Sequence, residues 1–265
     1  MPALYAHKTF GALVYKKLPR KLRRTVADNY QEFLLGLHGP DTLFFHLTHA
    51  GDEASENAKV IHRRSFEEMY HKAHKRLSAT ADPAELSYFL GVICHFVLDA
   101  VCHPVVTEAM ADTGLSHGKV EMEFERYLIK KNGREALKYP TYAHIPVSRS
   151  AAEHAAVFYD GVTPSRFFYS CASMKAINGI CRINDKRVRK ALTRVMDYTG
   201  NTKKVASLIM SRDESMMARK YVKKMYAAYT DSVDAAVDEA VTFADSVGAA
   251  EKISPLIKKN FYGVN

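Results

Sequence analysis

The sequence predicts an all-α fold, and three observations support this prediction. Apolar residues recur at steps of three and four over most of the chain, whereas the alternating pattern typical of strands is scarce. No Pro-, Ser- or Gly-rich linker divides the chain, and it contains no internal repeat. Its 265 residues are enough to bury a substantial core. We therefore expect a single multi-helix bundle domain over residues 1–265.

The N-terminal part is expected to consist of helices separated by breaks that contain Pro or Gly. Pro19 ends the first helix, and Gly36 with Gly39-Pro40 ends the second. Asp41 follows this break and is placed to cap a short helix. Residues 51–57 are polar and predict a loop. The helices expected here are residues 5–18, 21–36, 42–45 and 58–77.

A long apolar helix is expected to follow. It begins at Asp82-Pro83, where the aspartate caps the first turn and the proline occupies it. Apolar residues between Leu86 and Val101 cover nearly the whole circumference, which predicts a buried helix. Proline disfavours the α conformation in the residue before it, so Pro104 predicts that the helix ends or bends at His103.

The remainder of the chain is also predicted to be helical. Residues 112–114 indicate a turn, after which Ser116 caps a helix that carries His117 and Glu121. Residues 135–150 indicate a loop. The last helices are expected at residues 150–160, 164–177, 185–198, 202–210 and 213–246. In the last of these, apolar residues at steps of three and four predict core packing.

The formal net charge of +9 favours anionic partners, such as phosphate esters, nucleic acid or an anionic membrane surface. Basic residues gather in the ranges 16–24 and 182–194, although such runs are usually solvated helix faces. The four cysteines form no CxxC pair and are expected to be reduced and buried.

The beginning of the chain lacks a basic segment followed by an apolar one, so no signal peptide is visible. No apolar run is expected to reach membrane-spanning length. These two features predict a cytoplasmic protein without a transmembrane segment. The sequence predicts no particular oligomeric state.

Potential metal ligands recur at four-residue steps, first at His95, Asp99 and His103 and then at His117 and Glu121. Four residues of helix separate two side chains by about 40° of rotation and about 6 Å of rise, a spacing at which imidazole and carboxylate can bind one zinc ion. Eight residues correspond to about 12 Å, too far for one ion to join His95 and His103 easily. Because Asp99 has two oxygens, it can bridge two metals. The spacing therefore favours a multinuclear zinc site.

The alternative is that these residues are ordinary polar positions on amphipathic helices. The apolar surroundings of His95, Asp99 and His103 weigh against it, because burying such groups is costly unless they are paired or bound to a cation.

These residues occur in a recognisable arrangement. The run Phe89-Leu90-Gly91 is followed by His95, Asp99 and His103-Pro104, and then by His117 and Glu121. This arrangement resembles the bacterial zinc-dependent phospholipase C family, whose all-α superfamily also contains single-strand-specific fungal zinc nucleases. Three further segments match the family in the same order, Ala6-His7-Lys8, Gly39-Pro40-Asp41 and residues 61–66 around His62. The resemblance covers roughly residues 5–130.

The resemblance implies three zinc ions in a cleft between helices. The first zinc would be held by Asp41, His62, His95 and Asp99. The second would be held by His103, His117 and Glu121, and the third by His7 and the other oxygen of Asp99. It also implies that His62 opens the helix before the central one, and that Asp41 orients or deprotonates the attacking water. Two questions stay open, namely whether two or three zinc ions bind and whether His46 replaces His62.

The implied function is hydrolysis of a phosphodiester by zinc-activated water, most simply the phospholipase C-type release of a phosphorylated headgroup from a phospholipid. Two alternatives remain, a nuclease-like phosphodiesterase acting on single strands, and a non-catalytic helical protein that binds zinc or a lipid headgroup. A nuclease would need aromatic side chains that stack on bases, and the candidates are Phe44, Phe45, Phe167, Phe168 and Tyr169.

Several nearby polar residues are expected to lie outside the zinc ligand set. Glu123 and Glu125 are expected to face solvent, and Arg63 and Arg64 are candidates for neutralising a substrate phosphate. The other histidines are expected at the surface or behind the ligands.

Overall fold

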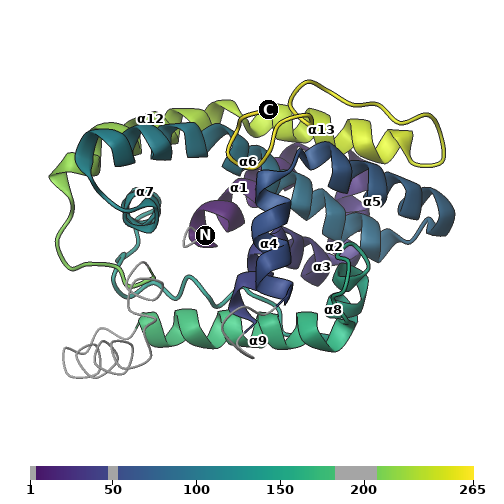
Figure 1. Cartoon of the computed structure of the whole chain (residues 1–265), viewed down its shortest axis with the longest axis horizontal. Coiled ribbons are helices and arrows are strands. Elements are labelled where there is room, and N and C mark those ends of the chain that lie inside the picture. The colour runs from purple at the N-terminus through teal and green to yellow at the C-terminus, as the bar shows by residue number, and fades with distance from the viewer. Residues whose placement is uncertain (1–3, 47–52, 183–207) are drawn as a thin grey trace.

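The computed structural model describes residues 4–46, 53–182 and 208–265. Within these ranges every regular element is a helix and no strand occurs, so the predicted all-α fold is confirmed (Figure 1). The expectation of a single domain over residues 1–265 stays a prediction. The helices are α1 (Leu4–Lys17), α2 (Arg20–Asp28), α3 (Tyr30–Gly36), the 3₁₀ helix η1 (Gly39–Phe45), α4 (Glu53–Arg63), α5 (Phe66–Thr80), α6 (Pro83–Thr113), α7 (His117–Lys131), α8 (Arg149–Ala156), α9 (Pro164–Cys181), the 3₁₀ helix η2 (Met216–Ala218), α12 (Arg219–Asp231) and α13 (Val233–Ser246).

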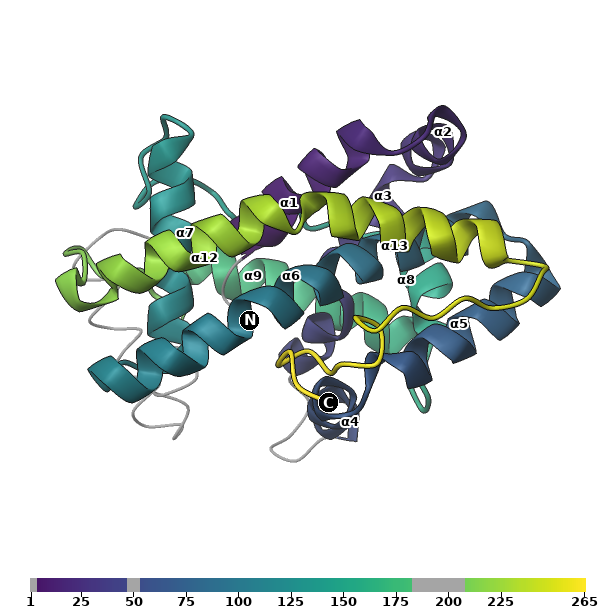
Figure 2. The same ribbon diagram turned by 90° about the horizontal axis from the view of Figure 1, so that it is seen from above.

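Helix α6 is the centre of the fold. Oδ1 of Asp82 accepts hydrogen bonds from the amides of Ala84 and Glu85, and Pro83 occupies the first turn, as the sequence predicts. The helix packs against α1, α3, α12 and α13, among others. Figure 2 shows α12 and α13 running end to end along it. Because neighbouring helices cover α6 on several sides, apolar residues occupy nearly its whole circumference.

One expectation about α6 was wrong. Its 31 residues are long and apolar enough to cross a membrane, whereas no run of that length was expected from the sequence. In the most apolar window, 83% of the residues are buried inside the protein. Core packing therefore accounts for the apolar character of this helix without a bilayer.

Pro104 does not end α6, which continues for nine residues beyond it to Thr113. The helix ends where Gly114 adopts a left-handed conformation with φ +69°. Proline has no N–H, so within α6 the carbonyl of Ala100 lacks the donor that residue 104 would otherwise provide. A helix end at His103 is therefore wrong, whereas the alternative of a bend there stays a prediction.

Three expected helices are each divided in two. Residues 21–36 break at Asn29, residues 58–77 break before Ser65, and residues 213–246 break at Ser232 after a later start at Met216. Ser65 explains one break, because its hydroxyl accepts a hydrogen bond from the amide of Glu67 and caps α5. Residues 53–57, expected to form a loop, are the beginning of α4.

The break between α4 and α5 also changes the expected position of His62. It lies in the last turn of α4 and does not open the following helix. Asp41 lies inside η1, whereas His38 occupies its N-cap position, so the predicted capping role of Asp41 was wrong.

The four cysteines are buried and free, as expected. The helix predicted at 185–198 and residues 202–207 of the one predicted at 202–210 fall outside the described residues, and residues 208–210 are not helical.

Helices α3 and α6 approach closely at two glycines. A β-carbon on Gly36 would lie 2.0 Å from the carbonyl oxygen of Tyr88, and one on Gly91 would lie 2.4 Å from that of Phe33. Both contacts are with backbone, which cannot move aside as a flexible side chain can. The α3–α6 crossing therefore requires glycine on both helices.

Replacing Gly91 by alanine should destabilise the protein, because the new methyl group forces α3 and α6 apart. We expect a loss of about 1–3 kcal/mol in the free energy of unfolding, measured by urea denaturation. Gly179→Ala in α9 is the matched control, since its β-carbon would meet only the Tyr142 ring at 3.5 Å. The control should be neutral or slightly stabilised. Equal stability of Gly91→Ala and the native chain would contradict the interpretation.

Candidate metal centre

All eight predicted ligands lie in groups of three that can each hold a metal ion. In each group one nitrogen or oxygen of every residue lies within 4.8 Å of the others. The groups are His7–His95–Asp99, Asp41–His62–His95 and His103–His117–Glu121. Five elements supply these residues, namely α1, η1, α4, α6 and α7. Residues from distant parts of the sequence therefore meet at one centre beside α6.

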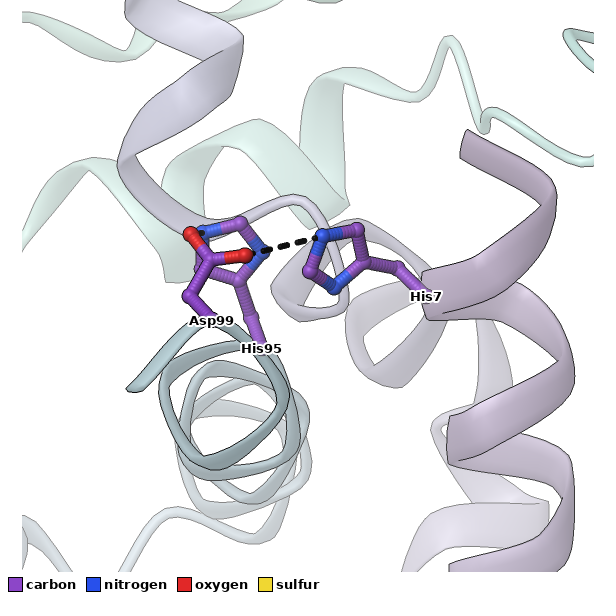
Figure 3. Close-up of side chains that lie close together, drawn as sticks. All are labelled: His7, His95 and Asp99. Carbon is purple, nitrogen blue, oxygen red and sulfur yellow. Dashed lines mark ion pairs between the residues drawn. The ribbon is translucent and has the colours of Figure 1, made fainter. Parts of the chain in front are cut away.

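Asp99 lies between histidines from two helices (Figure 3). Its Oδ1 is 3.3 Å from Nε2 of His7 on α1, and its Oδ2 is 3.5 Å from Nε2 of His95, one turn earlier on α6. Nε2 of His103, one turn later, is 3.9 Å from Oδ1. The four-residue spacing thus places the carboxylate among three imidazoles, and its two oxygens point to different partners.

Asp41 and His62 belong to the group that also contains His95. Oδ1 of Asp41 is 2.9 Å from Nε2 of His62. The 3₁₀ turn that carries Asp41 begins at Gly39, whose φ of +42° favours glycine. A β-carbon there would lie 3.2 Å from the His95 ring, so glycine also lets η1 approach α6.

The third group is the most open part of the centre. Glu121 lies 3.0 Å from Nε2 of His117, one turn earlier on α7, and 3.3 Å from Nε2 of His103 on α6. The His117 side chain is 31% exposed, whereas the side chain of each of the other seven ligand candidates is at most 7% exposed. Among the ligand candidates, His117 is therefore the one that solvent contacts most.

Backbone carbonyls fix the tautomer of three of the histidines. Nδ1 of His62 lies 2.7 Å from the carbonyl of Ala58, and Nδ1 of His95 lies 3.2 Å from that of Leu37. Nδ1 of His103 lies 2.5 Å from the carbonyl of Phe261. A carbonyl only accepts, so each Nδ1 carries the proton and each Nε2 is left to bind a metal.

The charge states of the buried groups suit a cation. Burial lowers the pKa of His95 to about 3, so its ring is neutral at pH 7. Burial alone would raise the pKa of Asp99, but the neighbouring His103, His95 and His7 hold it below its usual range. The pKa values of Asp41 and Glu121 are also well below their usual range despite burial, because nearby positive charge, to which the neighbouring histidines contribute, outweighs it. All three carboxylates are therefore anionic.

In the metal-free protein His103 carries positive charge. Burial opposes protonation of its ring, but Asp99 and Glu121 outweigh burial and raise the pKa of His103 to about 9. A proton there partly balances two buried carboxylates. A divalent cation would do so more completely, and would have to displace this proton.

Several buried atoms of the centre lack a hydrogen-bond partner among the described residues. They are Nδ1 of His7, Nε2 of His95 and Oδ2 of Asp99. Such atoms cost about 1–3 kcal/mol each when buried and unsatisfied. Imidazole nitrogen and carboxylate oxygen are the ligands that zinc prefers, together with thiolate. The residues present therefore fit zinc.

The grouping differs in one respect from the expected one. Asp99 was expected to join Asp41, His62 and His95 through one oxygen and His7 through the other, whereas in the structure it groups with His7 and His95 and not with Asp41 and His62. His95 belongs to two groups but has only Nε2 to offer. The assignment of residues to individual ions therefore stays a proposal.

His46 lies outside the three groups. Its ring nitrogen Nδ1 is 3.3 Å from the hydroxyl of Ser170 on α9. His62, and not His46, lies within reach of Asp41 and His95.

Glu123 and Glu125 were expected to face solvent, and this was wrong. Both are buried, and an arginine compensates the charge of each. Arg126 lies 3.1 Å from Glu123, and Arg182 lies 2.6 Å from Glu125. Glu125 also accepts a hydrogen bond of 2.7 Å from the amide of Tyr5, at the beginning of α1. It thereby holds the turn that carries His7.

The sequence contains a signal for this role that was not used. Glu125 follows Glu121 by four residues, so the same spacing that selects Glu121 places Glu125 on the same face of α7. His38 and His144 were expected at the surface or behind the ligands, but their contact with each other was not foreseen. Their Nε2 atoms lie 2.8 Å apart beside the centre.

The comparison with known families agrees with the geometry. A family model described as zinc dependent phospholipase C matches residues 6–171, more than half of the chain. All eight ligand candidates, from His7 to Glu121, lie within the match. No curated protein and no solved structure is significantly similar to the chain.

The raised pKa of His103 predicts how the metal-free protein responds to pH. The ring binds its proton more tightly in the folded state than at its ordinary pKa of about 6.5 in the unfolded state. This contribution to stability is complete below pH 6.5 and is lost as the pH rises towards 9. We expect the free energy of unfolding of EDTA-treated protein to fall by up to about 1.4 kcal/mol per pH unit in this range.

Urea denaturation at pH 6.5, 7.5 and 8.5 measures this loss. His103→Gln is the control, because it removes the titrating ring and should remove most of the pH dependence in the same range. Parallel curves for the native chain and for His103→Gln would contradict the role of His103.

Proposed function

Because the chain belongs to the zinc-dependent phospholipase C family, we propose that it is a zinc-dependent hydrolase that cleaves a phosphodiester. The preferred substrate class is a phospholipid from which a phosphorylated headgroup is released. The observation that carries the proposal is the meeting of eight His, Asp and Glu side chains in three groups within the matched region.

We propose two or three zinc ions, held by His7, Asp41, His62, His95, Asp99, His103, His117 and Glu121. When bound, such ions supply a Lewis acid for phosphoryl oxygens and lower the pKa of water from 15.7 to about 7. The chain contributes the geometry. Carbonyl-bound Nδ1 atoms orient three of the imidazoles, and the anionic Asp99 links α1 with α6.

Asp41 is the proposed catalytic residue. Its carboxylate is buried, anionic and held 2.9 Å from Nε2 of His62. An anionic oxygen at the wall of the centre can accept a hydrogen bond from the attacking water and so orient it towards phosphorus. Because the pKa of Asp41 is well below neutrality, its main contribution is orientation.

The aromatic side chains favour a lipid over a nucleic acid. Of the stacking candidates, Phe45 and Phe167 are buried in the core, and Phe44 packs against the His62 ring. Tyr169, at 58%, is the only one of the five that is exposed. The charge of +9 fits peripheral contact with an anionic membrane surface. That contact and the cytoplasmic location stay predictions.

The first test removes the shared carboxylate. Asp99→Ala should lose most of the bound zinc and reduce hydrolysis of a phosphodiester by at least about 100-fold. Mutating a group that only orients a metal ligand typically costs about 10–100-fold in affinity or activity, and Asp99 is itself a proposed ligand. Zinc per chain is measured by elemental analysis beside activity. Asp231→Ala, at the exposed end of α12, is the control and should keep both. Full activity in a zinc-free Asp99→Ala protein would rule out the mechanism.

The second test separates the candidate functions. We expect zinc-loaded protein to hydrolyse phosphatidylcholine in mixed micelles faster than single-stranded DNA of equal phosphate concentration, and chelation with EDTA to abolish the activity. A preference for DNA would support the nuclease alternative. Stoichiometric zinc with no hydrolysis of either substrate, or of bis(p-nitrophenyl) phosphate, would support a non-catalytic protein.

A further inference from the structure

Residues 260–264 lie against the metal centre, although they are far from the ligands in sequence. The chain after α13 returns along α5 to the end of α4 (Figure 2). There Lys258 and Lys259 accept hydrogen bonds through their carbonyls, from the Ser65 hydroxyl at 2.9 Å and the Phe66 amide at 2.8 Å. The break between α4 and α5 is thus the attachment point for this segment.

Three of the ligand histidines contact residues 260–264. The carbonyl of Phe261 accepts the hydrogen bond from Nδ1 of His103. The Phe261 ring is fully buried, with its centre 4.7 Å from that of His62 and 5.6 Å from that of His95. The Tyr262 ring lies over His103 at 5.3 Å.

The segment fits α6 at the position of the helical proline. A β-carbon on Gly263 would lie 2.2 Å from the carbonyl oxygen of Ala100 and 3.0 Å from Cγ of Pro104. Gly263 also has φ +74°, which favours glycine. Pro104 donates no hydrogen bond to Ala100, and the segment packs at this site. A side chain at position 263 would push the segment away from α6.

Asn260 holds the segment in its turn. Its Oδ1 accepts hydrogen bonds from the amides of Tyr262 at 2.9 Å and Val264 at 3.3 Å. Its Nδ2 donates to the carbonyl of Arg63, at the end of the helix that carries His62. One buried amide therefore couples the shape of the segment to α4.

We propose that residues 260–264 are a positioning element for the metal centre. The Phe261 carbonyl keeps the proton on Nδ1 of His103, so that Nε2 faces the cation shared with His117 and Glu121. The Phe261 ring restrains His62 and His95. This inference rests on the proposed zinc centre, but it concerns residues beyond the family match, which ends at residue 171.

The test compares two glycines with the same backbone requirement. Gly263→Ala should weaken the most weakly bound zinc by about 10-fold or more, because partners that orient ligands typically contribute 10–100-fold to metal affinity. Gly248→Ala is the matched control, since φ at Gly248 is +81° and nothing lies within 4 Å of its β-carbon. Affinities are measured on the whole chain by competition with a chromogenic chelator, beside thermal unfolding.

A second variant and a second measurement keep the proposal testable if Gly263→Ala does not fold. Asn260→Ala touches no ligand ring, yet it should give the same selective loss of zinc affinity. In the metal-free protein, ¹⁵N NMR of the imidazoles should show the His103 Nδ1 hydrogen bond in the native chain and its loss in the variant. His95, whose Nδ1 binds the Leu37 carbonyl, serves as the internal reference.

The outcomes separate the two proposals. If the native chain binds zinc and both Gly263→Ala and Asn260→Ala bind it equally tightly, the positioning role is overturned, but the zinc centre is not. Equal loss in Gly248→Ala would also overturn it, since backbone strain would then suffice. A native chain that binds no zinc, with an intact His103 hydrogen bond in the NMR spectra, would overturn the zinc centre and leave the segment's contact in place.

Discussion

The burial of the Asp99 carboxylate is the constraint on which the rest of the structure depends. A carboxylate deep in an apolar helix is stable only when neighbouring groups compensate its charge. His95 and His103 do so from the turns on either side, and His7 does so from α1. Because these partners come from different helices, the charge of Asp99 sets where α1 lies against α6. The requirement that makes the site fit a cation therefore also organises the helices around it.

The sequence predicts the beginning of α6 and the spacing of its ligand candidates, because both follow from local rules. The cap at Asp82 and the four-residue steps from His95 to His103 depend only on helix geometry, and the structure agrees with them. The breaks at Asn29 and Ser65 were missed, because apolar periodicity continues across both. Ser65 interrupts the helix through its capping bond and through contacts with residues near the other end of the chain. Such distant contacts leave no local pattern.

The difference between local patterns and contacts with distant residues also explains the errors around α7. Glu123 and Glu125 look like exposed positions, because charged residues on a helix usually face water. Their burial depends on Arg126 and on Arg182, and the latter lies 57 residues away from Glu125. The Phe261 carbonyl, which fixes His103, could not be predicted for the same reason, since a backbone group carries no sequence signal. The sequence therefore identifies the candidate ligands that the structure groups together, but not most of the groups that orient them.

The unequal exposure of the ligands has a kinetic consequence. His117 reaches solvent, whereas His95 and Asp99 are enclosed by helices. In the proposed zinc centre, an ion next to His117 would be able to exchange water while the fold stays closed, whereas an ion beside the buried Asp99 would need a movement of the surrounding helices to leave. If the proposed zinc ions bind, loading and depletion of the centre would therefore be ordered, and a brief treatment with a chelator would remove the ion next to His117 before the ion beside Asp99.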